Sequence, residues 1–295
     1  INFFLKAKKL NDKKLNIIAG LNELDDKTIN REQIIEISYN FQAGSYIDYY
    51  SENLECINSY TNEMSEIILK NAKKIGLKIS TFLDVGCGEL TTLKSLSEKI
   101  NRGIDYYAFD ISYPRVFIGQ NFIKKKMKSN ISVNCFVSEI NKIPLPSNSI
   151  DVVMTNHAIE PNLNKEKDLI REIYRVAKHM VILFEPSFEN ATNIVKHRMI
   201  KHGYAQKIDA TIRDYNMDLI EIKPMKNFIN KNNPTYCFTI LKDNSYKDMN
   251  INYTFPGSDY EIIKEDNWYK SKDLKVAFPI LNDLPILRTD KLLMI

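Results

Sequence analysis

Two acids and two glycines at the ends of apolar runs are the residues of this sequence best suited to hold a ligand. The apolar run Thr81–Val85 contains Asp84 and is followed at once by Gly86 and Gly88. Glycine has no Cβ atom, so such a turn lets the backbone come close to a bound molecule. A second acid, Asp110, ends the next apolar run at the distance of one βαβ unit, where an acid accepts hydrogen bonds from a ribose. The pattern predicts a site for an adenosine-containing cofactor.

The residues around the glycines separate two kinds of cofactor. Dinucleotide binding needs a third glycine, which allows close helix–strand packing beside a pyrophosphate. That position holds Thr91, and Glu89 stands where a pyrophosphate would arrive. A carboxylate is unfavourable beside a diphosphate and favourable beside a positive ligand, so the loop argues against a dehydrogenase. On the loop alone, a tight strand-to-helix turn in another α/β protein remains an alternative.

Three motifs together resemble those of the class I S-adenosylmethionine (SAM)-dependent methyltransferases. Their first motif is an acid-x-Gly-x-Gly loop, matched at residues 84–88. Residues 135–153 resemble the next two motifs: a strand ending at an acid that reads the adenine amino group, here Glu139, and a Leu-Pro loop leading into a fourth strand. In that strand Ile150 and Asp151 replace the usual Phe-Asp. The resemblance covers about residues 60–245 and does not identify the substrate.

The resemblance implies a fold and a cofactor. The fold is of the α/β class, with a seven-stranded, mostly parallel Rossmann-like sheet, a terminal antiparallel hairpin, and appendages at both ends. The cofactor is SAM, with the glycine loop around its methionine moiety and Asp110 at its ribose. The residues implied to bind it are Asp84, Gly86, Gly88, Asp110, Ile111, Glu139, Ile140 and Asn156.

The segment after the fourth expected strand holds the candidate catalytic residues. Many small-molecule methyltransferases have Glu-His there, whereas this chain has Glu160 followed by Pro161, so no role of that histidine is carried over. His157 lies just past the strand, and an imidazole titrates in the useful range for a base. A base matters when the acceptor is an alcohol, whose proton must leave early. His157 is the predicted base and Glu160 orients it or contacts the substrate; a hydrogen-bonded pocket histidine is an equal alternative.

Four further residues are candidates for binding the acceptor. Glu185 follows the fifth expected strand, at the rim of the sheet where α/β sites gather. Arg198 and His202 follow a helix from the same rim and would suit an anionic or hydroxylated acceptor. Tyr46 belongs to an aromatic cluster in an N-terminal extension that is expected to lie over the pocket. The alternatives are a helix surface capped by Gly203, and tyrosines that fasten the extension to the core.

These residues can meet only if strands bring them to one edge of a sheet. Apolar runs predict strands near residues 80–85, 105–110, 131–137, 150–155, 179–185, 217–225 and 236–242. Helices are expected over 60–76 and over Lys27–Ser38. The last two strands are joined by a polar turn too short for a crossover helix, which predicts an antiparallel hairpin.

The chain divides into three expected parts. They are an N-terminal extension covering the active site (1–58), the methyltransferase core (59–242) and a C-terminal appendage (243–295). Residues 277–287 resemble the closing segment of zinc-ribbon modules such as the activator subunit of tRNA and release-factor methyltransferases. The C-x-x-C knuckle of such a module would match at Cys237, where the second thiol is missing, and one thiol cannot hold zinc. The appendage is interpreted as a metal-free remnant or as a plain β-hairpin cap.

The composition is that of an ordinary globular protein. The 295 residues carry a net charge of +4, too small an excess to favour nucleic acid as a partner. No run of about 18 apolar residues occurs, so no membrane span is expected. The four cysteines are scattered without a C-x-x-C pair, which predicts no metal site and indicates a reducing cytoplasm. A partner protein or a second copy of the chain would bind through the C-terminal appendage.

Together these features predict a cytoplasmic SAM-dependent methyltransferase of small-molecule biosynthesis, which modifies an oxygen of a small-molecule or sugar-like acceptor. Methyl transfer mainly requires that acceptor and methyl be aligned at near-attack distance and that water be kept out. Two alternatives stay open: a methyltransferase acting on RNA or protein, and a non-catalytic partner that keeps the fold. The presence of Asp84 and Asp110 favours the enzyme.

Overall fold

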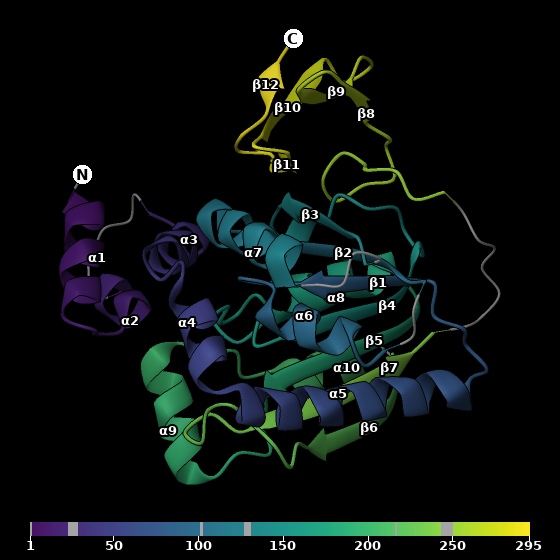
Figure 1. Ribbon diagram of the computed structural model, residues 1–295. Helices are drawn as coiled ribbons and strands as arrows, with labels where there is room; N and C mark the ends of the chain where they lie inside the picture. Colours follow the sequence, from purple (N-terminus) through teal and green to yellow (C-terminus); the bar gives the residue numbers. More distant parts are fainter. Residues whose placement is uncertain (1, 23–28, 101–102, 127–130, 216, 243–249) are drawn as a thin grey trace.

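A seven-stranded sheet forms the centre of the molecule (Figure 1), with strand order β3-β2-β1-β4-β5-β7-β6. The computed structural model describes residues 2–22, 29–100, 103–126, 131–215, 217–242 and 250–295. The strands are β1 (Thr81–Val85), β2 (Asp105–Asp110), β3 (Val133–Val137), β4 (Ile150–Asn156), β5 (Ala177–Pro186), β6 (Asp218–Pro224) and β7 (Thr235–Leu241). Each expected strand is therefore found, with bounds within about two residues of those predicted from apolar runs.

The directions of the strands confirm the expected fold class. Strands β1 to β5 run parallel, and β7 lies antiparallel between β5 and β6. The connection over residues 225–234 contains no helix, whereas a parallel pair would need a crossover connection. The polar turn in the sequence thus produces the terminal hairpin.

Helices cover both faces of the sheet (Figure 1). Successive strand residues point to opposite faces, so Phe82 packs in one apolar layer and Leu83 in the other. The helices that contribute to the first layer are α5 (Leu54–Lys74), α6 (Thr91–Ser97) and α7 (Tyr113–Lys126). Those that contribute to the second are α8 (Glu166–Val176) and α10 (Ile208–Asp214). Burial on both faces explains why the strands read as almost continuous apolar runs.

The N-terminal extension is a set of helices attached to the loops of the core. They are α1 (Asn2–Asp12), α2 (Ile17–Asn22), α3 (Arg31–Phe41) and α4 (Ser45–Glu52). Helix α3 begins later than expected because Asn30 and Gln33 form a capping box; Lys27 and Thr28 lie outside the described residues. Arg31 donates to the carbonyl oxygens of Pro161 (2.7 Å) and Gly203 (2.8 Å), the second just past α9 (Asn193–His202), and so fastens α3 to the core.

One expected boundary needs correction. Helix α5 runs without interruption from Leu54 to Lys74, so a division between residues 58 and 59 would cut through it. The helix packs on the core sheet along its length, with Ile57 already in the first apolar layer. The core therefore begins at the start of α5.

The C-terminal appendage forms a second, small antiparallel sheet and docks on the core. Its strands are β8 (Ile263–Glu265), β9 (Trp268–Ser271), β10 (Val276–Leu281), β11 (Leu284–Pro285) and β12 (Leu293–Met294). Ile286 forms a parallel bridge with Val137, and Leu287 N–H donates to the Val137 carbonyl at 2.9 Å. The appendage thus covers the edge of β3, whose backbone groups would otherwise be unpaired.

Cys237, where the knuckle of a zinc ribbon would match, lies in the core sheet and not in the appendage. Cys237 is a buried residue of β7, paired with Phe184 of β5 and Lys223 of β6, and belongs to the core sheet. The likeness of residues 277–287 to a zinc ribbon stays a prediction. Within the described part of the chain, no helix is long and apolar enough to cross a membrane.

Candidate cofactor and acceptor site

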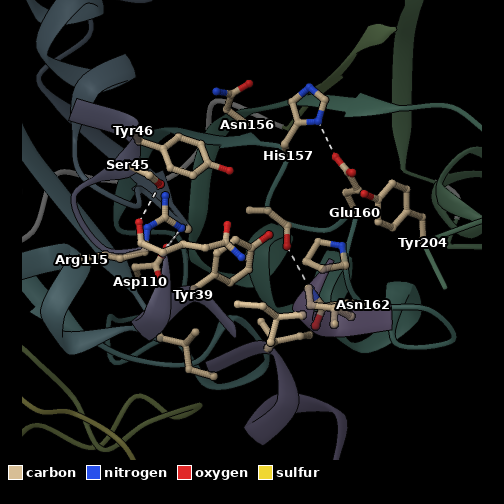
Figure 2. Close-up of a pocket in the computed structure, with 18 of the residues that line it drawn as sticks. Tyr39, Ser45, Tyr46, Asp110, Arg115, Asn156, His157, Glu160, Asn162 and Tyr204 are labelled. Carbon is tan, nitrogen blue, oxygen red and sulfur yellow. Dashed lines mark hydrogen bonds and ion pairs between the residues drawn. The ribbon is translucent and has the colours of Figure 1, made fainter. Parts of the chain in front are cut away.

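A cavity of about 960 Å³ lies at the carboxyl ends of the parallel strands (Figure 2). Its wall combines the loops after β1, β2, β3 and β4 with residues of the N-terminal helices. This edge is where ligands of α/β sheets bind, because the loops that follow parallel strands meet there. The volume is at the upper end of the usual range for a ligand pocket of about 300–1,000 Å³. One cavity can therefore hold a cofactor and an acceptor together.

The glycine loop after β1 requires its glycines. Gly86 and Gly88 have φ angles of +70° and +54°, in the left-handed region. A Cβ atom on Gly86 would lie 2.5 Å from that of Ala158, and one on Gly88 would lie 2.3 Å from Nη2 of Arg115. Gly86 lines the cavity, whereas Gly88 is in the loop beneath the Arg115 guanidinium. The close packing leaves the loop backbone as the surface that a ligand would meet.

Two acids lie beside this loop, as the sequence predicts. Asp110 lines the cavity, and its carboxylate accepts hydrogen bonds from the backbone N–H groups of Gly88 (3.0 Å) and Ser112 (2.9 Å). These bonds fix the carboxylate at the end of β2. Asp84 is 2 % exposed and is not part of the cavity wall. Burial, and then the neighbouring Asp110, raise the pKa of Asp84 to about 7.

The loops after β2 and β3 form the other end of the expected cofactor site. Ile111, Glu139 and Ile140 all line the cavity. Glu139 also pairs with the guanidinium of Arg288, at 3.2 Å, which the C-terminal appendage supplies. Burial raises the pKa of Glu139, and Arg288 opposes that rise. The appendage is thus in direct contact with an acid of the cavity wall.

His157 and Glu160 lie together in the cavity wall after β4. Nδ1 of His157 is 2.5 Å from Oε2 of Glu160 (Figure 2). Nε2 of His157 is 2.8 Å from Oγ1 of Thr235. Burial alone lowers the pKa of His157, but the Glu160 carboxylate and its hydrogen bond outweigh this, so the pKa is raised. The pair can hold one imidazole tautomer, with a proton on Nδ1 and a lone pair on Nε2.

Asn156 is the last residue of β4, and both polar groups of its side chain are hydrogen-bonded. Its Oδ1 accepts from the Tyr60 hydroxyl at 2.7 Å, and its Nδ2 donates to Oγ1 of Thr92 at 3.2 Å. It lines the cavity in a fixed orientation. Nearby in the wall, Oδ1 of Asn233 is buried and has no hydrogen-bond partner among the described residues. That oxygen can accept a hydrogen bond from a hydroxyl group of a ligand.

Three of the four predicted acceptor residues are not in the cavity wall. Glu185 is 0 % exposed, and its carboxylate accepts from the backbone N–H groups of Ala158, Ile159 and Glu160. It holds the loop that carries His157 and Glu160, and its side chain does not reach the surface of the cavity. Arg198 donates to the Asn232 carbonyl (3.2 Å), and His202 bonds to the Asn16 side chain (3.1 Å). Their polar groups serve the fold, because α9 points them at neighbouring loops.

Tyr46, the fourth, does line the cavity, but the expected role of Glu89 is wrong. Tyr46 stacks on Arg115, with 4.4 Å between the ring centroid and Cζ. Glu89 is 1 % exposed, and its two oxygens accept from the backbone N–H groups of Gly44 (3.1 Å) and Ile47 (2.9 Å). Glu89 therefore caps the start of α4 and does not face a positive ligand.

Sequence reasoning missed several residues of the wall. They are Tyr39, Arg115, Tyr204 and Asn233, with Thr235 and Arg288 in contact with wall residues. Arg115 could have been found, because it lies in the first turn of the helix after Asp110 and helical geometry turns that position toward the strand end. Arg288 has no local signal, since its partners are far away in the sequence.

Comparisons with known proteins agree with this geometry. Residues 83–184 match the family model described as a methyltransferase domain. Magnesium protoporphyrin IX methyltransferase from Synechocystis PCC 6803 with bound SAM is similar in structure: 12 % identity over 74 % of this chain and 100 % of that chain, TM-score 0.55. The same protein with bound SAH gives 13 % identity, 70 % and 99 % coverage, and a TM-score of 0.52. A SAM-dependent methyltransferase from Aquifex aeolicus is 23 % identical over 60 % of this chain and 87 % of that one, TM-score 0.42. No curated protein matches the sequence.

The cavity suits the cofactor that such a domain implies. The left-handed glycines present bare backbone, Asp110 is fixed where a ribose would lie, and Glu139 stands at the end of the next strand. The family match runs from within β1 to within β5 and so includes the loops that carry these residues. The sequence match and the fold identify a class I SAM-dependent methyltransferase domain in this chain.

Proposed function

We propose that this chain transfers a methyl group to an oxygen of a small-molecule or sugar-like acceptor. The observation that carries the proposal is the His157–Glu160 pair, which lies in the wall of the same cavity as the cofactor residues. When bound, SAM supplies the methyl group. The orphaned oxygen of Asn233 offers an acceptor hydroxyl a place to donate. A small acceptor is favoured because the N-terminal helices contribute residues to the wall of the cavity.

The proposed role of His157 follows from its two contacts. Glu160 holds the Nδ1 proton, which leaves the Nε2 lone pair beside the Thr235 hydroxyl. An acceptor hydroxyl can lose its proton to Nε2 directly or through Thr235 as the oxygen attacks. The raised pKa makes His157 a stronger base, and it must be neutral to act, so the rate should increase as the pH rises through this pKa.

The remaining residues bind and exclude water. We assign Asp84, Gly86, Gly88, Asp110, Ile111, Glu139, Ile140 and Asn156 to the cofactor side, with Asp84 and Gly88 acting on the shape of the loop. The N-terminal extension covers the site through Tyr39 and Tyr46, and the appendage borders it through Arg288. The cysteines are free, which supports a reducing compartment such as the cytoplasm.

The first test is calorimetric titration of the purified chain with SAH, with NADH as the control ligand. Micromolar binding of SAH and no binding of NADH is the expected result. Hydroxylated, amino and thiol compounds are then screened by formation of SAH from SAM. His157→Asn should lower the rate with a hydroxylated acceptor by about 100-fold or more, with SAH affinity kept. Turnover of amines alone, unaffected by this variant, would contradict oxygen methylation. Binding of SAH without turnover of any small molecule would favour an RNA or protein acceptor.

A further inference from the structure

Arg115 is a buried cation whose guanidinium makes no hydrogen bond to the described residues. It lies in the first turn of α7, is 6 % exposed and belongs to the cavity wall. Among the residues that the structure describes, its guanidinium donates no hydrogen bond, and Nε is buried without a partner. A guanidinium has five N–H donors, and burying a charge without such bonds is costly. The arrangement indicates that the guanidinium of Arg115 can bind an anionic ligand.

The neighbouring acids are already committed to other donors. Nε of Arg115 is 3.5 Å from Oε1 of Glu89, and Nη1 is 3.9 Å from Oδ2 of Asp110. Charge-assisted hydrogen bonds are shorter, about 2.7–2.9 Å. Each acid instead accepts two backbone N–H groups, Glu89 from α4 and its N-cap and Asp110 from the loops after β1 and β2. Burial alone lowers the pKa of Arg115, but Asp110 and the other neighbours outweigh it, so the group stays charged.

Two tyrosines of the N-terminal extension hold the guanidinium in place. Cζ of Arg115 is 4.8 Å from the ring centroid of Tyr39 and 4.4 Å from that of Tyr46 (Figure 2). Stacking against aromatic rings keeps a guanidinium oriented and leaves its edge free for a planar partner. A carboxylate can bind to that edge through two parallel hydrogen bonds, in a bidentate manner.

The position of the Arg115 guanidinium indicates which anionic group it would bind. Nη2 lies against Gly88, so the charge stands over the glycine loop, where the amino-acid part of SAM is expected. This part of SAM carries a carboxylate. We propose that Arg115, stacked on Tyr39 and Tyr46, binds the carboxylate of the amino-acid part of the cofactor. The inference rests on the proposed function and adds to it a specific anion site that the N-terminal helices complete.

The competing explanation is that Arg115 only links the N-terminal helices to α7. A ligand that lacks the carboxylate separates the two. We would titrate the full-length protein with SAH and with decarboxylated SAH, which keeps the adenosine, thioether and amine. A charged hydrogen-bonded contact predicts that the wild type binds SAH about 10–100-fold more tightly than the decarboxylated compound. In Arg115→Met this preference should fall to about twofold or less.

Controls keep the result interpretable. Arg213→Met removes an exposed arginine paired with Asp209 on α10 and should leave the preference unchanged. Arg115→Lys should keep part of it, because the charge remains. Equal weakening of both ligands in Arg115→Met would show a purely structural role and overturn the inference. If Arg115→Met does not fold, equal affinity of the wild type for both ligands would overturn it without any variant. Failure of the wild type to bind SAH at all would instead refute the proposed cofactor.

Discussion

Three acids of this domain, Asp84, Glu89 and Glu185, lie near the ends of strands in a similar way but have different roles in the structure. Glu185 holds the backbone of the loop after β4, and Glu89 holds the start of α4. In the described part of the chain, no such set of backbone donors faces Asp84, and burial raises the pKa of Asp84 to about 7. The loop that Glu185 holds includes His157 at the left-handed φ of +55°, an uncommon conformation that needs support from its surroundings. For a single residue, the role of a carboxylate therefore depends on the hydrogen-bond donors that surround it.

The raised pKa of Asp84 predicts a pH-dependent affinity. The ammonium group of SAH favours the ionised carboxylate, so lowering the pH from 8 to 6 should weaken SAH binding by about tenfold. The pKa in the folded state lies above the ordinary value of 3.8, so protons favour the folded state over this range. Ionisation of Asp84 should therefore lower the stability of the ligand-free protein as the pH rises from 6 to 8.

Calorimetry at pH 6, 7 and 8 measures this effect, and thermal unfolding follows the stability. Asp84→Asn cannot ionise, so its SAH affinity should be weaker at pH 8 and nearly independent of pH. Its unfolding temperature should also lose the decrease between pH 6 and 8 that Asp84 contributes. An unchanged pH dependence in Asp84→Asn would assign the linkage to another group, such as His157.

The N-terminal helices are the elements that turn an open sheet edge into an enclosed cavity. Helices α3 and α4 carry Tyr39 and Tyr46 into the wall. Three contacts attach these helices to the core. Glu89 of the core binds backbone N–H groups at the start of α4, and Arg31 of α3 donates to carbonyl oxygens of the core. The Ser112 hydroxyl donates to the Asn40 side chain at 2.6 Å. Opening of these helices would expose the site to water and remove both tyrosines from Arg115.

Removal of the Glu89 carboxylate should loosen this attachment. Glu89→Ala leaves two backbone N–H groups without their acceptor and removes the nearer of the two acids beside the buried charge of Arg115. We expect a loss of about 2–4 kcal/mol in the free energy of unfolding, measured by denaturant titration. Cleavage by a protease within residues 30–52 should also become faster. Glu98→Ala is the control, because Glu98 pairs with Lys94 near the surface and should cost about 0.5 kcal/mol or less. Equal stability of the two variants would refute this role of Glu89.

In the whole molecule, the two appendages meet at the cofactor site. Arg288 follows the segment that pairs with the edge of β3 and is 3 % exposed. Its guanidinium pairs with Glu36 of α3 at 2.9 Å and with Glu139 of the cavity wall at 3.2 Å. The C-terminal appendage, the N-terminal extension and the core therefore share one cation.

Arg288→Met should weaken SAH binding by about tenfold, because two neighbouring carboxylates would lose their shared partner and Glu139 would move or take up a proton. Calorimetry at constant pH measures the affinity. Lys291→Met is the matched control: among the described residues Lys291 pairs with the surface residue Asp290 alone, so this variant should bind SAH like the wild type. Unchanged affinity in Arg288→Met would mean that the appendage only covers the sheet edge.

The sequence by itself determined the sheet and its glycine loop. Apolar runs give strands, glycines give the left-handed turns at Gly86 and Gly88, and a short polar turn gives the terminal hairpin. His157 and Glu160 were also within reach, because three residues separate them on one loop. All of these features depend on neighbours in the chain, whose conformational preferences are local.

Only the tertiary structure decided which polar groups face the ligand. Glu89 and Glu185 were expected to be acids of the site, but their carboxylates accept hydrogen bonds from backbone N–H groups of distant segments. Arg115 and Arg288 drew no prediction from the sequence, yet both are buried beside the cavity. The reason is physical: a buried polar side chain is oriented by whichever donors and acceptors surround it, and the long-range packing of both appendages supplies them.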